Sequence, residues 1–143
     1  MITSKQKGLV QETFGLIEPI APTAAFLFYQ RLFDIDPTVR PMFMGNIGEQ
    51  GKKLMQALAL AVKSLDRPEA LKPVLQDLGR RHAMYGVTDA HYDTVGAALI
   101  WTLERGLGDR FTADVREAWV AVYGVVATTM KAAANEAANE ATV

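Results

Sequence analysis

Cysteine is absent from the 143 residues of this chain. Disulfide bonds, thiolate-bound zinc, cysteine-ligated iron–sulfur clusters and cysteine nucleophiles are therefore excluded. Long apolar runs are absent too, since no stretch reaches the roughly 18 apolar residues that a membrane span needs. Residues 1–14 also lack the apolar core of a signal peptide. We therefore expect no membrane span and, because no export signal is visible, a cytoplasmic protein.

An excess of charge is missing as well. The 15 Lys and Arg against 16 Asp and Glu leave a formal net charge of −1, which gives no overall attraction to nucleic acid. The sequence has no GxSxG, no phosphate-binding loop, no GxGxxG and no HExxH. Hydrolase, kinase and nucleotide-binding functions therefore have little support. Histidine is scarce: His82 and His91 lie nine residues apart, a spacing that puts them on opposite sides of a helix and makes them a poor zinc pair.

What the sequence does contain is helical periodicity from end to end, without the alternation typical of strands. Thr3 or Ser4 is the expected N-cap of the first helix. Further helices are predicted at about 21–35, 48–65, 69–84 and 89–107 and after Thr112. About six to eight unequal helices favour an irregular helical globule over a regular four-helix bundle. By length, residues 1–143 form one domain, and we expect the alanine-rich end, 134–143, to fray.

His82 lies on the inward face of its predicted helix. It follows three leucines at positions i, i+4 and i+7, itself at i+11. Such a histidine is more often a plain core residue than a metal ligand. Two arginines precede it; they suit a helix C-terminus and could equally pair with the carboxylates of a buried anionic cofactor. Tyr29 and Gln50 also have ordinary explanations, as a core aromatic residue and a solvated first-turn residue.

Four segments taken together resemble the globin family, in particular the bacterial single-domain haemoglobins and the globin module of flavohaemoglobins. They are FYQRLFDIDPTVRPMF (28–43), the stretch containing Gln50, Lys53 and Leu54, LGRRHAMYGVTDAHYDTVG (78–96) and AWVAVYGVVA (118–127). The resemblance implies an all-α globin fold around a b-type haem. Covalent c-type attachment is excluded because cysteine is absent.

The resemblance also assigns site residues. His82 would be the proximal iron ligand, and Tyr29 and Gln50 would be the distal pair that hydrogen-bonds bound ligand. Around them it places one group of supporting residues: Phe43 wedged against the macrocycle, Leu54 on the distal side, Lys53 and Arg81 near the haem propionates, Val87 and Val95 on the proximal side, and Tyr92 orienting His82. One departure is Ala134, which stands where flavohaemoglobin-type globins carry a glutamate. Its absence is expected to leave His82 less anionic and to weaken peroxidase-like chemistry.

Reversible binding of O2, and also of CO and NO, is the function that the resemblance implies. Two distal donors predict slow O2 release. NO dioxygenation to nitrate would need a separate reductase, because the chain ends where a flavohaemoglobin would continue into its reductase module. The alternatives are an O2 carrier or store without turnover, a gas sensor, and a haem-free helical interaction domain. A monomer or a homodimer fits the sequence.

Overall fold

The computed structural model describes residues 2–43 and 46–141, the last five by their backbone alone. Within these residues all regular structure is helical, which confirms the all-α prediction. The six α-helices are α1 (Ser4–Ile17), α2 (Ala21–Ile35), α3 (Ile47–Lys63), α4 (Pro68–Met84), α5 (Asp89–Leu107) and α6 (Ala113–Ala141). Short 3-10 segments lie at Glu18–Ile20, Pro37–Met42 and Gly108–Arg110.

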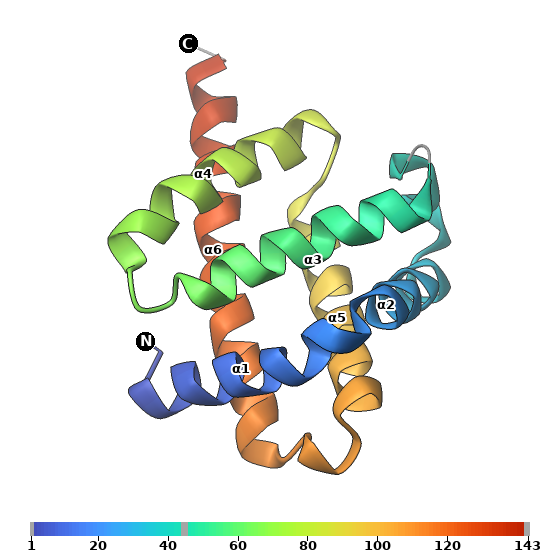
Figure 1. Cartoon of the computed structure of the whole chain (residues 1–143). Helices are drawn as coiled ribbons and strands as arrows, with labels where there is room; N and C mark the ends of the chain where they lie inside the picture. The colour runs from blue at the N-terminus through green and yellow to red at the C-terminus, as the bar shows by residue number, and fades with distance from the viewer. Residues whose placement is uncertain (1, 44–45, 142–143) are drawn as a thin grey trace.

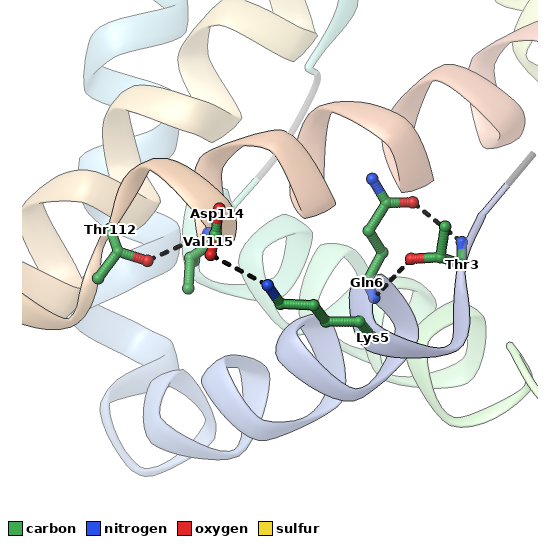
Figure 2. A network of polar contacts seen from close by, with 6 residues as sticks. All are labelled: Thr3, Lys5, Gln6, Thr112, Asp114 and Val115. Atoms are coloured by element: carbon green, nitrogen blue, oxygen red, sulfur yellow. Dashed lines mark hydrogen bonds and ion pairs between the residues drawn. The ribbon is translucent and has the colours of Figure 1, made fainter.

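Helix caps account for most of these boundaries. Thr3 caps α1 through a capping box, in which its hydroxyl accepts from the Gln6 N–H at 3.1 Å and the Gln6 side chain accepts from the Thr3 N–H at 3.0 Å. Figure 2 shows this box, and beside it the ion pair between Lys5 and Asp114 that joins the start of α1 to the start of α6. After α4, Gly86 takes a φ of +89°, a value that glycine adopts without strain.

The long helix α6 is the axis of the molecule, with α1 and α4 both crossing it (Figure 1). Trp119 of α6 is almost completely buried, and its indole N–H donates to the Thr13 hydroxyl of α1 at 2.9 Å. Burying an indole requires such a partner for its N–H. The α1–α6 contact therefore joins apolar packing to one specific hydrogen bond.

The crossing of α4 over α6 depends on Gly79. A Cβ at this position would lie 2.3 Å from the backbone oxygen of Met130, so the two backbones approach more closely than any side chain allows. Gly79 stands three residues before His82. The crossing therefore fixes the turn of α4 that carries the only histidine predicted to bind a metal.

The helix α6 continues to Ala141, so the stretch from residue 134 is helical as far as the structure describes it. Fraying of this end stays a prediction, and residues 142–143 lie outside the described part. Among the described helices, none has the length and apolar character needed to cross a lipid bilayer.

Candidate functional site

Tyr29 connects α2 to the first turn of α3. Its side chain is only 4% exposed, and its hydroxyl donates to the backbone oxygen of Gln50 at 3.2 Å. The close approach of the two helices depends on Gly51, where a Cβ would lie 2.9 Å from the Cβ of Ala25. The structure thus brings Tyr29 and Gln50 together, but through the backbone of Gln50 and not through its amide group.

Aromatic rings surround Tyr29 on the same side. The Tyr29 ring meets Phe43 edge-on with centroids 5.2 Å apart, and Phe33 lies 6.1 Å from Tyr29 and 5.7 Å from Phe43. The Arg40 guanidinium caps the group over the Phe33 ring, at 5.2 Å. The predicted distal pair, Tyr29 and Gln50, and the predicted haem-packing Phe43 therefore share one wall, which we call the distal wall.

The Tyr29 hydroxyl keeps its proton at neutral pH. Burial raises its pKa from 10.0 to about 12, because a phenolate is poorly solvated in this environment. A protonated phenol can donate one hydrogen bond and accept others. The distal wall thus presents a fixed donor in surroundings where hydrogen bonds are strong.

Leu54 lines a small pocket between α1, α2, α3, α5 and α6. Its volume is about 20 Å³, and its other walls include Phe28, Leu58 and Leu103. This is about the size of one water molecule, and the lining is apolar except for Thr102, whose hydroxyl donates to the Ala98 oxygen. Leu54 is half-buried and belongs to the packed core on this side of the molecule.

His82 is held by its own helix. Its Nδ1 lies 2.8 Å from the backbone oxygen of Leu78. A carbonyl oxygen can only accept, so Nδ1 carries the proton and the neutral ring has a free lone pair at Nε2. This is the tautomer that a metal-binding histidine needs, and the hydrogen bond to the Leu78 oxygen orients its ring.

A single imidazole fits haem better than a bare metal ion. Among the described residues no three His, Cys, Asp or Glu side chains gather as a metal site. Haem brings four ligands of its own and needs only an axial residue from the protein. The donor chemistry of His82 therefore fits the cofactor that the sequence predicts.

Tyr92 is buried, and its hydroxyl has no hydrogen-bond partner within the described part of the chain. Its pKa is raised, chiefly by burial and also by the nearby charge of Asp89. The backbone oxygen of Tyr92 accepts from the Tyr123 hydroxyl at 2.6 Å, and Lys131 Nζ lies 5.6 Å from the centre of the Tyr92 ring. The orientation of His82 is thus set by Leu78 in this structure, and a role of Tyr92 toward His82 stays a prediction. Neither Tyr123 nor Lys131 was singled out by the sequence.

The remaining predicted residues lie at the edges of the site. Lys53 is exposed, and Arg81 is exposed and paired with Asp77 one turn earlier. Val87 donates its N–H to the His82 oxygen at 3.1 Å. Several apolar side chains on and beside these helices are only half-buried, namely Phe43, Leu54, Met55, Leu58, Leu78, Val87 and Val95. They are free to gain contacts from an apolar group.

Comparison with known proteins decides the family. A profile described as Globin matches residues 27–130, which includes the distal wall, His82 and most of α6. The chain belongs to the globin family. Haem is the cofactor and small gases are the ligand class that membership of the globin family implies.

Relatives of two different lengths are among the matches. The flavohemoprotein of Vibrio cholerae is 31% identical over 126 residues, and that of Rhizobium meliloti 33% over 131. This globin chain spans about a third of each, 32% of their length. The neuroglobin of Danio rerio is 28% identical over 143 residues and is matched over 90% of both proteins.

Solved globin structures support the fold. A bacterial globin from Campylobacter jejuni superposes with a TM-score of 0.83 at 24% identity, over 96% of this chain and 99% of that one. A candidate nitric oxide dioxygenase from Rhodothermus marinus, engineered as a carbene transferase, gives 0.89 at 22% identity over the whole of both chains. These likenesses confirm the predicted globin fold.

Proposed function

We propose that this globin holds haem b on His82 and binds O2 reversibly, with Tyr29 as the main hydrogen-bond donor to the bound gas. The observation that carries the proposal is the buried, protonated Tyr29 hydroxyl on the distal wall. Haem bound here would supply an iron with one position open to O2, CO or NO. The protein would hold the iron, exclude water and place a proton donor beside the ligand.

Each chain residue has a separate task in this proposal. His82 would hold the iron through its Nε2 lone pair, while the Leu78 oxygen accepts its Nδ1 proton. Tyr29 donates one hydrogen bond to the ligand, and the half-buried Gln50 amide can offer a second. The exposed cations Lys53 and Arg81 can approach the haem propionates; Arg81 would then leave or share its partner Asp77.

Oxidation of NO to nitrate is the second function we propose, with a separate reductase. The conversion consumes NO, O2 and one electron, so an electron donor has to renew the reduced state after each turnover. Its support is the similarity to flavohemoproteins, of which this chain matches only about a third. A carrier or store without turnover is the alternative, and it is favoured by the proximal side, where the described contact of His82 Nδ1 is a backbone oxygen and not a carboxylate.

The deciding experiment measures O2 dissociation after the substitution Tyr29→Phe. Loss of one hydrogen bond to a charged acceptor should speed dissociation roughly ten- to a hundredfold, as measured by stopped-flow displacement with CO. Tyr85→Phe is the matched control, since Tyr85 is 70% exposed. An unchanged rate in Tyr29→Phe would remove Tyr29 from the proposal. Mixing the O2 form with NO and assaying nitrate then separates dioxygenation from storage.

A further inference from the structure

We propose that the backbone oxygen of Gln50 competes with bound ligand for the Tyr29 proton, and that Gly51 is the positioning residue that sets this competition. The inference rests on the proposed function, because it assumes that Tyr29 donates to the ligand. The consequence is selectivity between ligands. Bound O2 has to draw the Tyr29 hydrogen bond away from the Gln50 oxygen, whereas CO leaves that hydrogen bond in place.

The competition follows from the number of protons. A phenol has one, and in this structure it is directed to the Gln50 oxygen. The hydroxyl cannot donate to the ligand and to this carbonyl at full strength together. When Tyr29 donates to the ligand, its hydrogen bond to the Gln50 oxygen at the start of α3 is therefore lost.

The relative strengths of the two hydrogen bonds decide whether Tyr29 donates to the Gln50 oxygen or to the ligand. The Tyr29–Gln50 distance is 3.2 Å, longer than the roughly 2.7–2.8 Å usual for O–H···O bonds. Its acceptor is also neutral. A ligand that draws negative charge, as bound O2 does, accepts about twice as strongly and should capture the proton. CO stays nearly neutral and should not.

Gly51 places the Gln50 oxygen within reach of Tyr29. A Cβ on residue 51 would lie 2.9 Å from the Ala25 Cβ, below the 3.4 Å at which ordinary contact begins. Both atoms would be fixed to helix backbones, so neither could turn aside. The start of α3 would have to move by about 0.5 Å or more, which would take the Tyr29–Gln50 pair beyond hydrogen-bond range.

The substitution Gly51→Ala therefore should free the Tyr29 proton for the ligand. We expect O2 dissociation to slow roughly three- to tenfold, the value of one neutral hydrogen bond, while CO dissociation stays unchanged. Gly15→Ala is the matched control, because a Cβ there would meet no atom within 4 Å. Adding Ala25→Gly to Gly51→Ala removes the close contact and should restore the wild-type O2 rate.

A double-mutant cycle with Tyr29→Phe separates the two proposals. In the Tyr29→Phe background, Gly51→Ala should have no effect on O2 dissociation. If Tyr29→Phe alone changes nothing, the role of Tyr29 in the proposed function fails. If Tyr29→Phe speeds dissociation but Gly51→Ala equals wild type, only the Gln50 competition is wrong.

A measurement on the unaltered protein covers the case in which Gly51→Ala does not fold. With a ¹³C label on the Gln50 carbonyl, the NMR shift should differ between the O2 and CO forms, because only O2 removes the hydrogen bond from Tyr29. The same pair of forms of Tyr29→Phe should show no such difference. Equal shifts in the O2 and CO forms of the unaltered globin would overturn the inference.

Discussion

Tyr29 is held by a residue from another helix, whereas His82 is held by its own. The Tyr29 hydroxyl reaches from α2 to the backbone of α3, and the Tyr29 ring packs against three phenylalanines. The His82 ring is bonded only one turn back, to Leu78, and is half-buried. The Tyr92 hydroxyl, predicted to act on His82, is buried without a described partner.

The two sides of the site are held in place by different kinds of contact. The distal wall depends on tertiary packing, because its contacts join α2 to the first turn of α3 and to Phe43. On the proximal side the tautomer of His82 is set locally by helix geometry, and the position of the ring is set by the close crossing at Gly79. A buried hydroxyl without a described hydrogen-bond partner, such as that of Tyr92, is uncommon in a folded protein and calls for an explanation.

The largest effect should come from His82→Ala. If His82 is the axial ligand, haem binding should be lost, and the haem absorption band should be missing or strongly altered after reconstitution. His91→Ala is the matched control, since His91 accepts from the Thr88 N–H in the capping box of α5 and has no role in the proposed haem site. Unchanged haem retention and spectrum in His82→Ala would place the ligand elsewhere.

The substitution Gly79→Ala tests whether the proximal side depends on the α4–α6 crossing. The new methyl group would meet the Met130 backbone, which cannot rotate away, so the free energy of unfolding should fall by about 2–3 kcal/mol. Urea unfolding of the haem-free globin measures it. Gly15→Ala, a helical site with open space around it, should stabilise slightly. A loss no greater than that of Gly15→Ala would show that the crossing tolerates a side chain.

Alkaline pH should weaken the distal wall through Tyr29. Burial raises the Tyr29 pKa from 10.0 to about 12, so its contribution is complete below pH 10 and is lost as pH rises toward and past 12. Linkage gives a loss of about 1 kcal/mol by pH 11 and about 2 kcal/mol by pH 12. The measurement is the difference in unfolding free energy between the unaltered globin and Tyr29→Phe across this range. Parallel curves would mean that the folded protein does not raise this pKa.

The smallest effect is expected for Tyr92→Phe. Removing a buried hydroxyl without a partner should stabilise the haem-free protein by about 1 kcal/mol. With haem bound, the gain should vanish if the hydroxyl then finds an acceptor on the proximal side. Urea unfolding of both forms gives the answer. A destabilised haem-free variant would mean that the hydroxyl already has a partner.

Much of the fold could be predicted because its signals are local. Thr3, one of the two N-caps expected for the first helix, caps α1, and helical periodicity predicted the six α-helices. The globin resemblance also named Tyr29, Gln50 and Phe43, which the structure brings into one wall.

What could not be predicted depends on how helices cross. Nothing local shows that Tyr29 would meet the backbone of Gln50 and not its amide. Gly51 and Gly79 are visible in the sequence as glycines inside helices, a pattern that signals close approach. The sequence does not say what approaches, because that depends on the angle and depth at which distant segments pack.

The bond between Trp119 and Thr13 has a consequence for the timing of folding in the cell. The two residues are 106 positions apart in the chain. At about 5–20 residues per second, a ribosome adds Trp119 roughly 5–20 s after Thr13. For that interval the apolar face of α1 has no α6 to cover it, so the nascent globin exposes Phe14 and its neighbours until the last helix emerges.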